Sequence, residues 1–348
     1  MITNDNILIK CDNINGLQWL IDNGYSNAID LVYIDPPFAT GGSFSVDNTG
    51  RASSVSMSKN GDIAYEDTLK GKEFLDFLKE RIILIHTLLS DRGSLYLHID
   101  YKIGHYVKVL LDEIFGIDNF RNDITRIKCN PKNFDRVGYG NVKDMILFYS
   151  KGRNPIWNKP ETQYTEEEKA KLYNKIDKNG RRYTTVPIHA PGETIGGETA
   201  KPFKGIYPPP GRHWRCSVEE LERLDNAGLI EWSKNGNPRK INYADERVGK
   251  KSQDIWCFKD PTYPLYPTQK NIDMLKFIIN ASSNSDSIVM DCFCGAGTTL
   301  KGAQECGRHW IGMDKSPLAI KITLEQVGNT DNTLFNNNYH INYFEINK

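Results

Sequence analysis

The sequence predicts an α/β fold in which helices cover both faces of an open, doubly wound sheet, with a separate lobe inserted into the chain. Four largely apolar runs each end in an acidic residue, at 29–35, 93–100, 287–291 and 309–314. Helical patterns alternate with these runs, at 73–89, 106–115, 272–281 and 298–306. Apolar runs that alternate with helices are typical of buried parallel strands. Pro-rich and basic pieces break this alternation in the middle of the chain.

The two ends of the chain are expected to build one sheet together. Residues 1–124 begin it with the strand 29–35, the helix 73–89 and the strand 93–100, followed by a further helical pattern. Residues 261–348 supply only about two or three strands, which are too few for a self-sufficient sheet. We therefore expect two halves of a single domain, 1–124 and 261–348, on either side of an insert at 125–260.

Composition narrows the class of protein. Of the 348 residues, 39% are hydrophobic, which is enough for a packed core and too many for a disordered chain. The longest apolar stretch, near 82–89, falls short of the ~20 residues of a bilayer span, and the first residues do not resemble a secretory signal. We expect a cytoplasmic protein. Seven scattered cysteines without a Cys-x-x-Cys pair favour neither disulfides nor a metal site.

The net charge of zero hides an asymmetry along the chain. Residues 121–260 hold 27 Lys and Arg against 19 Asp and Glu, an excess of +8, and the rest of the chain holds 17 against 25. A basic middle between acidic ends is expected when one lobe faces a polyanion such as nucleic acid. A solvated surface with chance clustering would give the same count.

A glycine-rich turn near the C-terminus predicts a nucleoside site. The strand 287–291 runs into Asp291-Cys-Phe-Cys-Gly-Ala-Gly-Thr298 and then a helical pattern. Two glycines at a strand-to-helix turn let the backbone approach a ligand, and Asp314 at the end of the next strand can accept both ribose hydroxyls. A dinucleotide-binding dehydrogenase would use a similar layout, but Leu300 stands at the third glycine position and the Asp291 carboxylate would repel a pyrophosphate. S-adenosylmethionine, a cationic nucleoside without phosphate, fits better.

A second constellation, Asp35-Pro36-Pro37-Phe38, directly follows the strand 29–35. Two prolines remove two N–H donors, which leaves the Asp35 side chain and the Pro36 carbonyl as acceptors. Such a corner suits an amine, and two hydrogen bonds from a nucleobase amine can free its lone pair to attack a methyl sulfonium. Phe38 offers a ring on which a base flipped out of a duplex can stack. We expect the catalytic residues to be Asp35, Pro36, Pro37 and Phe38.

At these two motifs the chain resembles DNA amino-methyltransferases of the β class, in which an Asp-Pro-Pro-Tyr/Phe motif comes first and a Phe-x-Gly-x-Gly motif comes last. The segment Tyr266-Pro-Thr-Gln-Lys270 is similar to the family's His-Pro-Thr-Gln-Lys-Pro element, which helps hold the methionine end of the cofactor. The segment Lys10-Cys11-Asp12 is similar to a Gly-Asp element near the cofactor adenine. Tyr266, Asn271 and Cys292 depart from the family's pattern at packing positions. The resemblance covers nearly the whole chain.

The resemblance implies a circularly permuted Rossmann-like methyltransferase sheet, with 125–260 as an inserted target-recognition region. It implies an S-adenosylmethionine site made by Asp12, Thr268, Gln269, Lys270, Asp291, Phe293, Cys294, Gly295, Gly297, Thr298 and Asp314. In that family an Asp before the two prolines usually goes with adenine N6, and a Ser usually goes with cytosine N4. The implied reaction is site-specific methylation of a flipped-out adenine in double-stranded DNA.

Several other functions fit the same residues. A cytosine-N4 DNA methyltransferase or an RNA adenine methyltransferase would carry these motifs, and a catalytically silent DNA-binding module would keep the fold. Methylation of cytosine C5 is excluded because that reaction needs a Pro-Cys pair, and none of the sixteen prolines precedes a cysteine. In the basic lobe we expect DNA contacts from Arg212, Arg215, Lys250 and Lys251. The sequence leaves open a homodimer and a companion restriction endonuclease.

Overall fold

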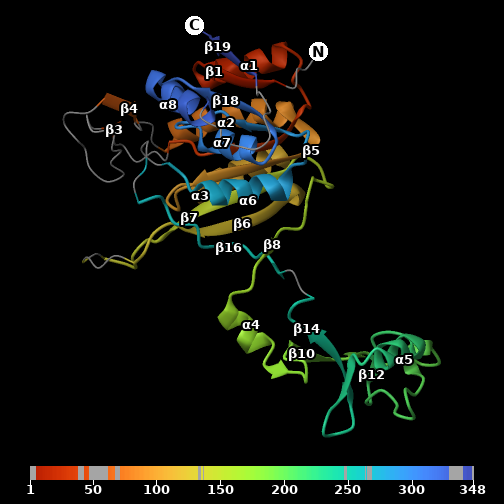
Figure 1. Ribbon diagram of the computed structural model, residues 1–348. Helices are drawn as coiled ribbons and strands as arrows, with labels where there is room; N and C mark the ends of the chain where they lie inside the picture. The colour runs from red at the N-terminus through yellow and green to blue at the C-terminus, as the bar shows by residue number, and fades with distance from the viewer. Residues whose placement is uncertain are drawn as a thin grey trace. The chain divides into compact units, whose positions relative to one another are not determined.

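The computed structural model divides the chain into two compact units (Figure 1). Unit 1 comprises Met1–Pro160 and Gln253–Lys348, and unit 2 comprises Glu161–Ser252. The structure describes residues 5–37, 43–46, 62–66, 71–131, 135, 137–246, 249–262, 264, 269–328 and 340–346. Phe38 and Thr268, two residues of the predicted site, lie outside these ranges.

A nine-stranded sheet forms the centre of the described part of unit 1. In spatial order its strands are β16 (Ile255–Trp256), β6 (Phe120–Ile127), β7 (Lys143–Ser150), β5 (Leu89–Ile99), β2 (Ile29–Ile34), β17 (Ile288–Asp291), β18 (His309–Asp314), β1 (Asn6–Lys10) and β19 (Ile341–Glu345). Neighbouring strands are parallel, except that β7 is antiparallel to β5 and β6. Because β2 pairs with β17, the two ends of the chain complete one sheet, as the sequence predicts.

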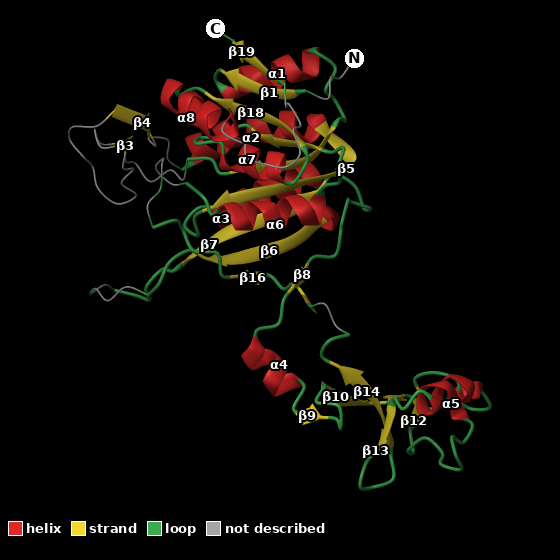
Figure 2. Cartoon of the chain, in the orientation of Figure 1, coloured by secondary structure: helices red, strands yellow, loops and turns green. Residues whose placement is uncertain are grey.

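Helices cover both faces of this sheet (Figure 2). One core cluster contains side chains of α1 (Asn13–Asp22), α2 (Lys72–Leu88) and α3 (Gly104–Phe115). The other contains side chains of α6 (Ile272–Ser282), α7 (Thr298–Glu305) and α8 (Pro317–Gly328). Successive residues of a strand point to opposite faces, so Leu31 and Val32 of β2 belong to different clusters. The doubly wound arrangement confirms the predicted fold class.

Smaller elements complete unit 1. A 3-10 turn, η1 (Ile117–Asn119), links α3 to β6. The strands β3 (Ser43–Val46) and β4 (Asp62–Glu66) form a separate antiparallel pair. No helix in the described ranges is long and apolar enough to cross a membrane.

Unit 2 is built on an antiparallel sheet with the order β13 (Ile230–Trp232), β14 (Pro238–Tyr243), β10 (Arg182–Pro187) and β9 (Lys175–Ile176). Two further strand pairs are β11 (His189–Pro191) with β12 (Arg212–Trp214), and β8 (Glu161–Thr162) with β15 (Lys250–Lys251). The helices are α4 (Glu166–Leu172), α5 (Val218–Asn226) and a 3-10 turn, η2 (Glu198–Ala200). A small core forms around the buried side chains of Phe203, Trp214 and Leu221.

The boundaries of unit 2 differ from those of the predicted insert, 125–260. Residues 125–160 and 253–260 belong to unit 1, because β6, β7 and β16 pair into its sheet. The run Met145–Tyr149 of β7 is buried and contributes alternately to the cores on the two faces. This burial holds β7 in the main sheet, although it follows the point where the alternation of strands and helices breaks. A role of unit 2 in target recognition stays a prediction.

Candidate active site

Four carboxylates belong to one edge of the main sheet, where four adjacent parallel strands end. Asp35 follows β2, Asp291 ends β17, Asp314 ends β18 and Asp12 follows β1 by two residues. Carboxyl ends of parallel strands meet at the same edge, so Asp12 and Asp314, which are 302 positions apart in the sequence, converge there. Burial raises the pKa of Asp291, and the charges of Asp35 and Asp314 raise it further, so both of these carboxylates lie within electrostatic range of Asp291.

Asp35 forms a nearly buried ion pair. Its Oδ2 lies 2.5 Å from Nζ of Lys270, and the two side chains are 16% and 9% exposed. Its Oδ1 is buried and accepts no hydrogen bond from any described residue. Pro36 and Pro37 follow outside any helix or strand, and they add no N–H donors to this corner. The structure therefore brings Lys270, which was expected at the cofactor, onto the expected catalytic carboxylate.

The glycine-rich turn after β17 packs against the end of β18. Gly297 has a φ of 76°, and a Cβ there would lie 2.7 Å from Cγ2 of Thr323, so a side chain would be both strained and crowded. The N–H of Gly295 donates to Oδ2 of Asp314 at 2.9 Å, and the hydroxyl of Thr323 donates to the Gly295 carbonyl at 3.0 Å. These contacts hold the backbone of the turn beside Asp314.

Burial governs the two central carboxylates. Asp291 accepts hydrogen bonds from the N–H of Phe293 (3.0 Å) and the hydroxyl of Thr299 (2.6 Å), yet burial raises its pKa to about 7. Burial also raises the pKa of Asp314, against the N–H groups of Ser316 and Gly295 that bond to it. Within the described ranges, neither Asp291 nor Asp314 forms an ion pair, in contrast to Asp35 and its lysine. The middle of the edge therefore suits a positively charged ligand.

Comparison with known proteins identifies the family. The model of a family described as "DNA methylase" matches residues 29–325. The chain belongs to this DNA methylase family. The "Type II methyltransferase M.EcaI" of Enterobacter cloacae is 41% identical over 327 residues, which is 92% of this chain and 69% of the relative. The "Type III restriction-modification enzyme StyLTI Mod subunit" of Salmonella typhimurium is 26% identical over 84% of this chain and 49% of its own length.

Similarity to a solved structure agrees with this membership. The structure of "PvuII DNA methyltransferase (cytosine-N4-specific)" matches with a TM-score of 0.52 at 12% identity, over 97% of this chain and 89% of that chain. At this identity the similarity shows the fold alone. The expectation of a Rossmann-like methyltransferase sheet is thereby confirmed.

Asp12 of this DNA methylase is tied to a residue that sequence reasoning missed. Its Oδ1 accepts a hydrogen bond from Arg81 at 2.9 Å, and Arg81 also donates to Oδ1 of Asn13 at 2.5 Å. Nδ2 of Asn13 in turn donates to the Cys292 carbonyl at 3.0 Å, so the cluster links α1 and α2 to the end of β17. Arg81 is 5% exposed and lies on the buried stripe of α2. Arg81 could have been identified from the sequence as a charged residue within an apolar stripe of a predicted helix.

The remaining predicted cofactor residues lie along the turn and before α6. Cys294 and Thr298 are buried, and Phe293 is half-buried, with its ring centroid 6.2 Å from that of Phe77. Gln269 precedes Lys270 in the short segment that leads into α6. The structure assigns none of these four residues a direct part in chemistry.

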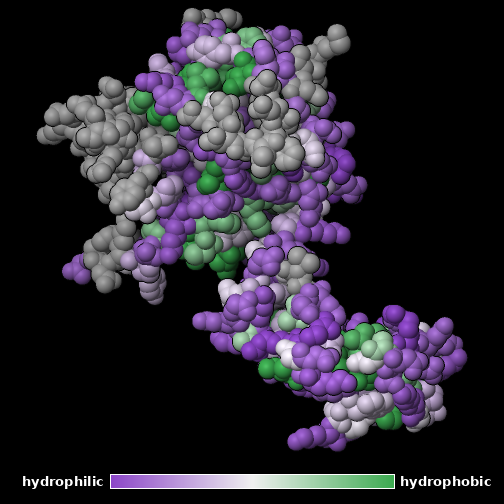
Figure 3. Space-filling view, viewed as in Figure 1, coloured by the Kyte–Doolittle hydropathy of each residue, from purple (hydrophilic) through white to green (hydrophobic). Residues whose placement is uncertain are grey.

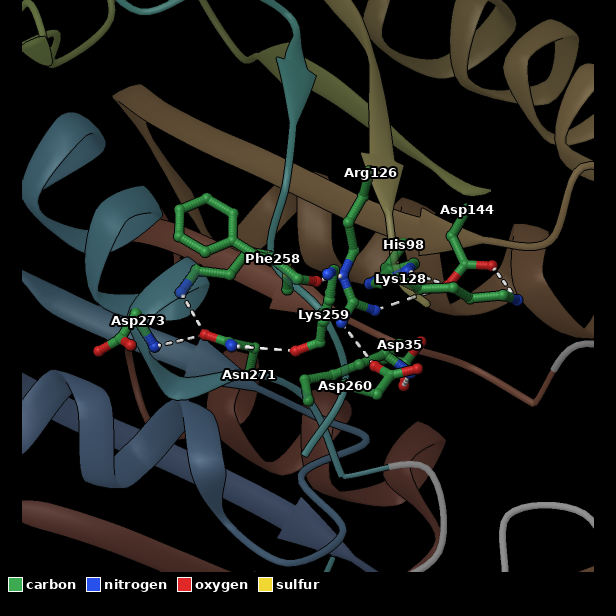
Figure 4. Close-up of polar contacts among 12 residues, drawn as sticks. Asp35, His98, Arg126, Lys128, Asp144, Phe258, Lys259, Asp260, Asn271 and Asp273 are labelled. Atoms are coloured by element: carbon green, nitrogen blue, oxygen red, sulfur yellow. Dashed lines mark hydrogen bonds and ion pairs between the residues drawn. The ribbon is translucent and has the colours of Figure 1, made fainter. Parts of the chain in front are cut away.

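A buried polar network lies next to Asp35 (Figure 4). His98 on β5 is bonded through Nδ1 to the hydroxyl of Tyr33 (2.8 Å) and through Nε2 to Oδ2 of Asp144 (3.1 Å). Nζ of Lys128 donates to the other oxygen of Asp144 at 2.6 Å. Burial acts to raise the pKa of Asp144, but the bonds from His98 and Lys128 hold it well below its usual range. Sequence reasoning missed this network because Tyr33, His98 and Asp144 lie on three different strands and Lys128 directly follows a fourth, β6.

In unit 2, the predicted DNA contacts Arg212 and Arg215 flank His189. NH1 of Arg212 lies 3.2 Å from Nδ1 of His189, and Nε of Arg215 donates to the His189 carbonyl at 3.3 Å. Partial burial lowers the pKa of His189, and the charges of Arg212, Arg215 and Arg239 lower it further. Arg212 and Arg215 are exposed, and neither pairs with a carboxylate in the described part of the unit. Together they make a positively charged surface.

The predicted pair Lys250 and Lys251 has a different environment. Lys250 forms an ion pair with Glu168 of α4, and Lys251 is exposed on β15. A lysine whose charge is already compensated contributes less to the binding of phosphate. The visible face of unit 2 is mostly hydrophilic (Figure 3).

Proposed function

We propose that this DNA methylase transfers a methyl group from S-adenosylmethionine to the N6 amine of an adenine flipped out of duplex DNA. Membership of the family supports methyl transfer to DNA as the reaction class. The observation that carries the proposal is Oδ1 of Asp35, which is buried and accepts no hydrogen bond from the described residues. An unpartnered buried acceptor costs about 1–3 kcal/mol. The N–H group of a target amine would remove that cost.

The acceptors at the end of β2 supply the chemistry that the target amine needs. One N–H of the amine donates to Asp35 and the other to the Pro36 carbonyl, and this orientation leaves the nitrogen lone pair free to react. S-adenosylmethionine, when bound, supplies an electrophilic methyl group on a sulfonium. The N–C bond forms as the S–C bond breaks, the electron pair of that bond stays on sulfur, and N6 then releases one proton to water. This order requires no general base.

The charge at the sheet edge supports this cofactor over a dinucleotide. A pyrophosphate would meet Asp291 and Asp314, whereas a sulfonium and an ammonium group are attracted to them. We propose that Asp314 accepts the ribose hydroxyls and that the backbone at Gly295 and Gly297 lies along the nucleoside. Phe293, Cys294 and Thr298 on the same turn would complete this site.

The choice of base and the partners are also proposals. Asp35 stands before two prolines, as in the adenine-specific members that the chain resembles, and this supports adenine as the target base. The N4 amine of cytosine is the alternative target. Arg212 and Arg215 are proposed to contact DNA, since they are exposed and lack carboxylate partners among the described residues. One relative is a Type III restriction-modification enzyme subunit, which supports a companion restriction endonuclease.

Transfer of a labelled methyl group tests the function directly. Unmethylated genomic DNA is incubated with the protein and methyl-tritiated S-adenosylmethionine, digested to nucleosides and separated by chromatography. We expect label in N6-methyl-2′-deoxyadenosine with the parent protein and none with the Asp35→Ala variant. Label in N4-methyl-2′-deoxycytidine would make cytosine the target base in place of adenine, and equal labelling by the Asp35→Ala variant would overturn the assignment of Asp35 to the site.

A further inference from the structure

The two oxygens of the Asp35 carboxylate are not equivalent. Oδ2 is 2.5 Å from the ammonium of Lys270, and both side chains are nearly buried. Oδ1 accepts no hydrogen bond from the described residues. A charge-assisted hydrogen bond with little competing water is strong and directional, so it fixes the rotation of the carboxylate. The oxygen left over then points in one defined direction.

The backbone next to Lys270 is anchored from two sides (Figure 4). Oδ1 of Asn271 caps α6 by accepting from the N–H groups of Asp273 (2.9 Å) and Met274 (3.1 Å). Its Nδ2 donates to the Lys259 carbonyl at 3.0 Å. A lysine has a long, flexible side chain, but this cap fixes where that side chain begins. This cap explains structurally why Asn271 stands where the family usually has proline.

Two other polar side chains near Asp35, those of Tyr33 and His98, are already engaged in hydrogen bonds. Asp144 has a pKa well below its usual range and therefore only accepts, so Nε2 of His98 carries the proton of their shared hydrogen bond. Burial, and next the charge of Lys270, lowers the pKa of His98, so the ring is neutral at pH 7. Nδ1 of this neutral ring is an acceptor, and the Tyr33 hydroxyl donates to it. Neither Tyr33 nor His98 is left to donate to Asp35.

We infer that Lys270 is a positioning residue for methyl transfer: it holds Oδ2 of Asp35 so that Oδ1 alone receives the N–H group of the target amine. The inference rests on the proposed function, because that function assigns the amine to Asp35. It differs from the role implied by the family resemblance, which places this lysine at the methionine end of the cofactor. Lys270 takes no proton in the reaction, since the proton released by N6 goes to water.

The test separates the rate of transfer from the affinity for the cofactor. Lys270→Met and Lys270→Arg are compared with the parent by single-turnover labelling of unmethylated genomic DNA at saturating S-adenosylmethionine, and by calorimetric titration with S-adenosylmethionine. We expect Lys270→Met to slow transfer about 10- to 100-fold, as misplaced catalytic groups do, with a Kd within about threefold of the parent's. Lys270→Arg keeps a donor and should recover at least about tenfold of that loss.

Lys276→Met is the matched control. Lys276 lies on α6 and pairs with Glu305 rather than with Asp35. The Lys276→Met variant should therefore transfer the methyl group at the same rate as the parent. Thermal denaturation checks the fold, and Lys270→Gln replaces Lys270→Met if the latter does not fold. If Lys270→Met raised the Kd for S-adenosylmethionine tenfold and left the rate at saturation unchanged, Lys270 would contact the cofactor and the inference would be overturned. An active Asp35→Ala variant would overturn the proposed function itself, whereas an inactive one beside a fully active Lys270→Met overturns only the inference.

Discussion

Replacing Asp291 with Asn should make the protein progressively more stable than the parent as the pH rises from 5 to 7. Burial raises the pKa of Asp291 from 3.8 to about 7 in the folded state. Between these values the unfolded chain has lost the proton and the folded chain keeps it, so the free energy of unfolding falls as the pH rises. The stabilisation is complete below pH 4 and is lost by about pH 7. Asn does not titrate, and it keeps an oxygen for the N–H of Phe293.

The magnitude follows from the pH window. Well below the folded pKa of about 7, each pH unit gives about 1.36 kcal/mol, and the slope halves at that pKa. The relative gain for Asp291→Asn between pH 5 and 7 is therefore about 2 kcal/mol, with little change above pH 7. Urea unfolding of ligand-free parent and variant at pH 5, 6, 7 and 8, followed by circular dichroism, measures the difference at each pH. Asp286→Asn is the control, since Asp286 is exposed just before β17. A difference between parent and variant that stays constant from pH 5 to 8 would refute the reasoning.

Three further predictions concern the cofactor, the target amine and DNA. Asp314→Ala should raise the KM for S-adenosylmethionine about tenfold or more with a smaller effect on the rate at saturation, and an unchanged KM in steady-state assays would remove Asp314 from the cofactor site. Asp35→Ala should slow transfer at least about a hundredfold while calorimetry still detects cofactor binding, and near-normal turnover would contradict it. The double change Arg212→Ala and Arg215→Ala should reduce the log–log salt slope of DNA binding by about one to two, in fluorescence anisotropy across a salt series, whereas Lys250→Ala, whose charge is paired, should change it less. The prediction fails if the paired lysine has the larger effect.

Much of the fold could be predicted because its signals are local. The apolar runs at β2, β17 and β18 and the stripes of α2, α3, α6 and α7 appear within windows of 4 to 17 residues. The sequence was less informative about elements whose local pattern of apolar and polar residues is mixed. β7 lies between exposed and basic segments, so its place in the main sheet became clear only from its pairing with β5 and β6.

The candidate site divides in the same way. An acidic residue before two prolines, and two glycines between a strand and a helix, limit the backbone through sterics and missing donors, and this chemistry can be read without a structure. The family resemblance then agreed with the roles already predicted for Asp35 and Asp314. It also suggested a cofactor role for Lys270, which stays a prediction; the structure adds an ion pair between Lys270 and Asp35.

Local chemistry in the chain was therefore enough to predict the strands, the turns and the carboxylates at their ends, because each depends on neighbours in sequence. Contacts between distant residues required the folded chain. Lys270 reaches Asp35 across 235 positions, and Arg81 reaches Asp12 across 69, only because the order of strands brings their segments to one edge. Burial at that edge then sets the charge of Asp291. Strand order and burial arise from packing of the whole chain, so no local pattern in the sequence encodes them.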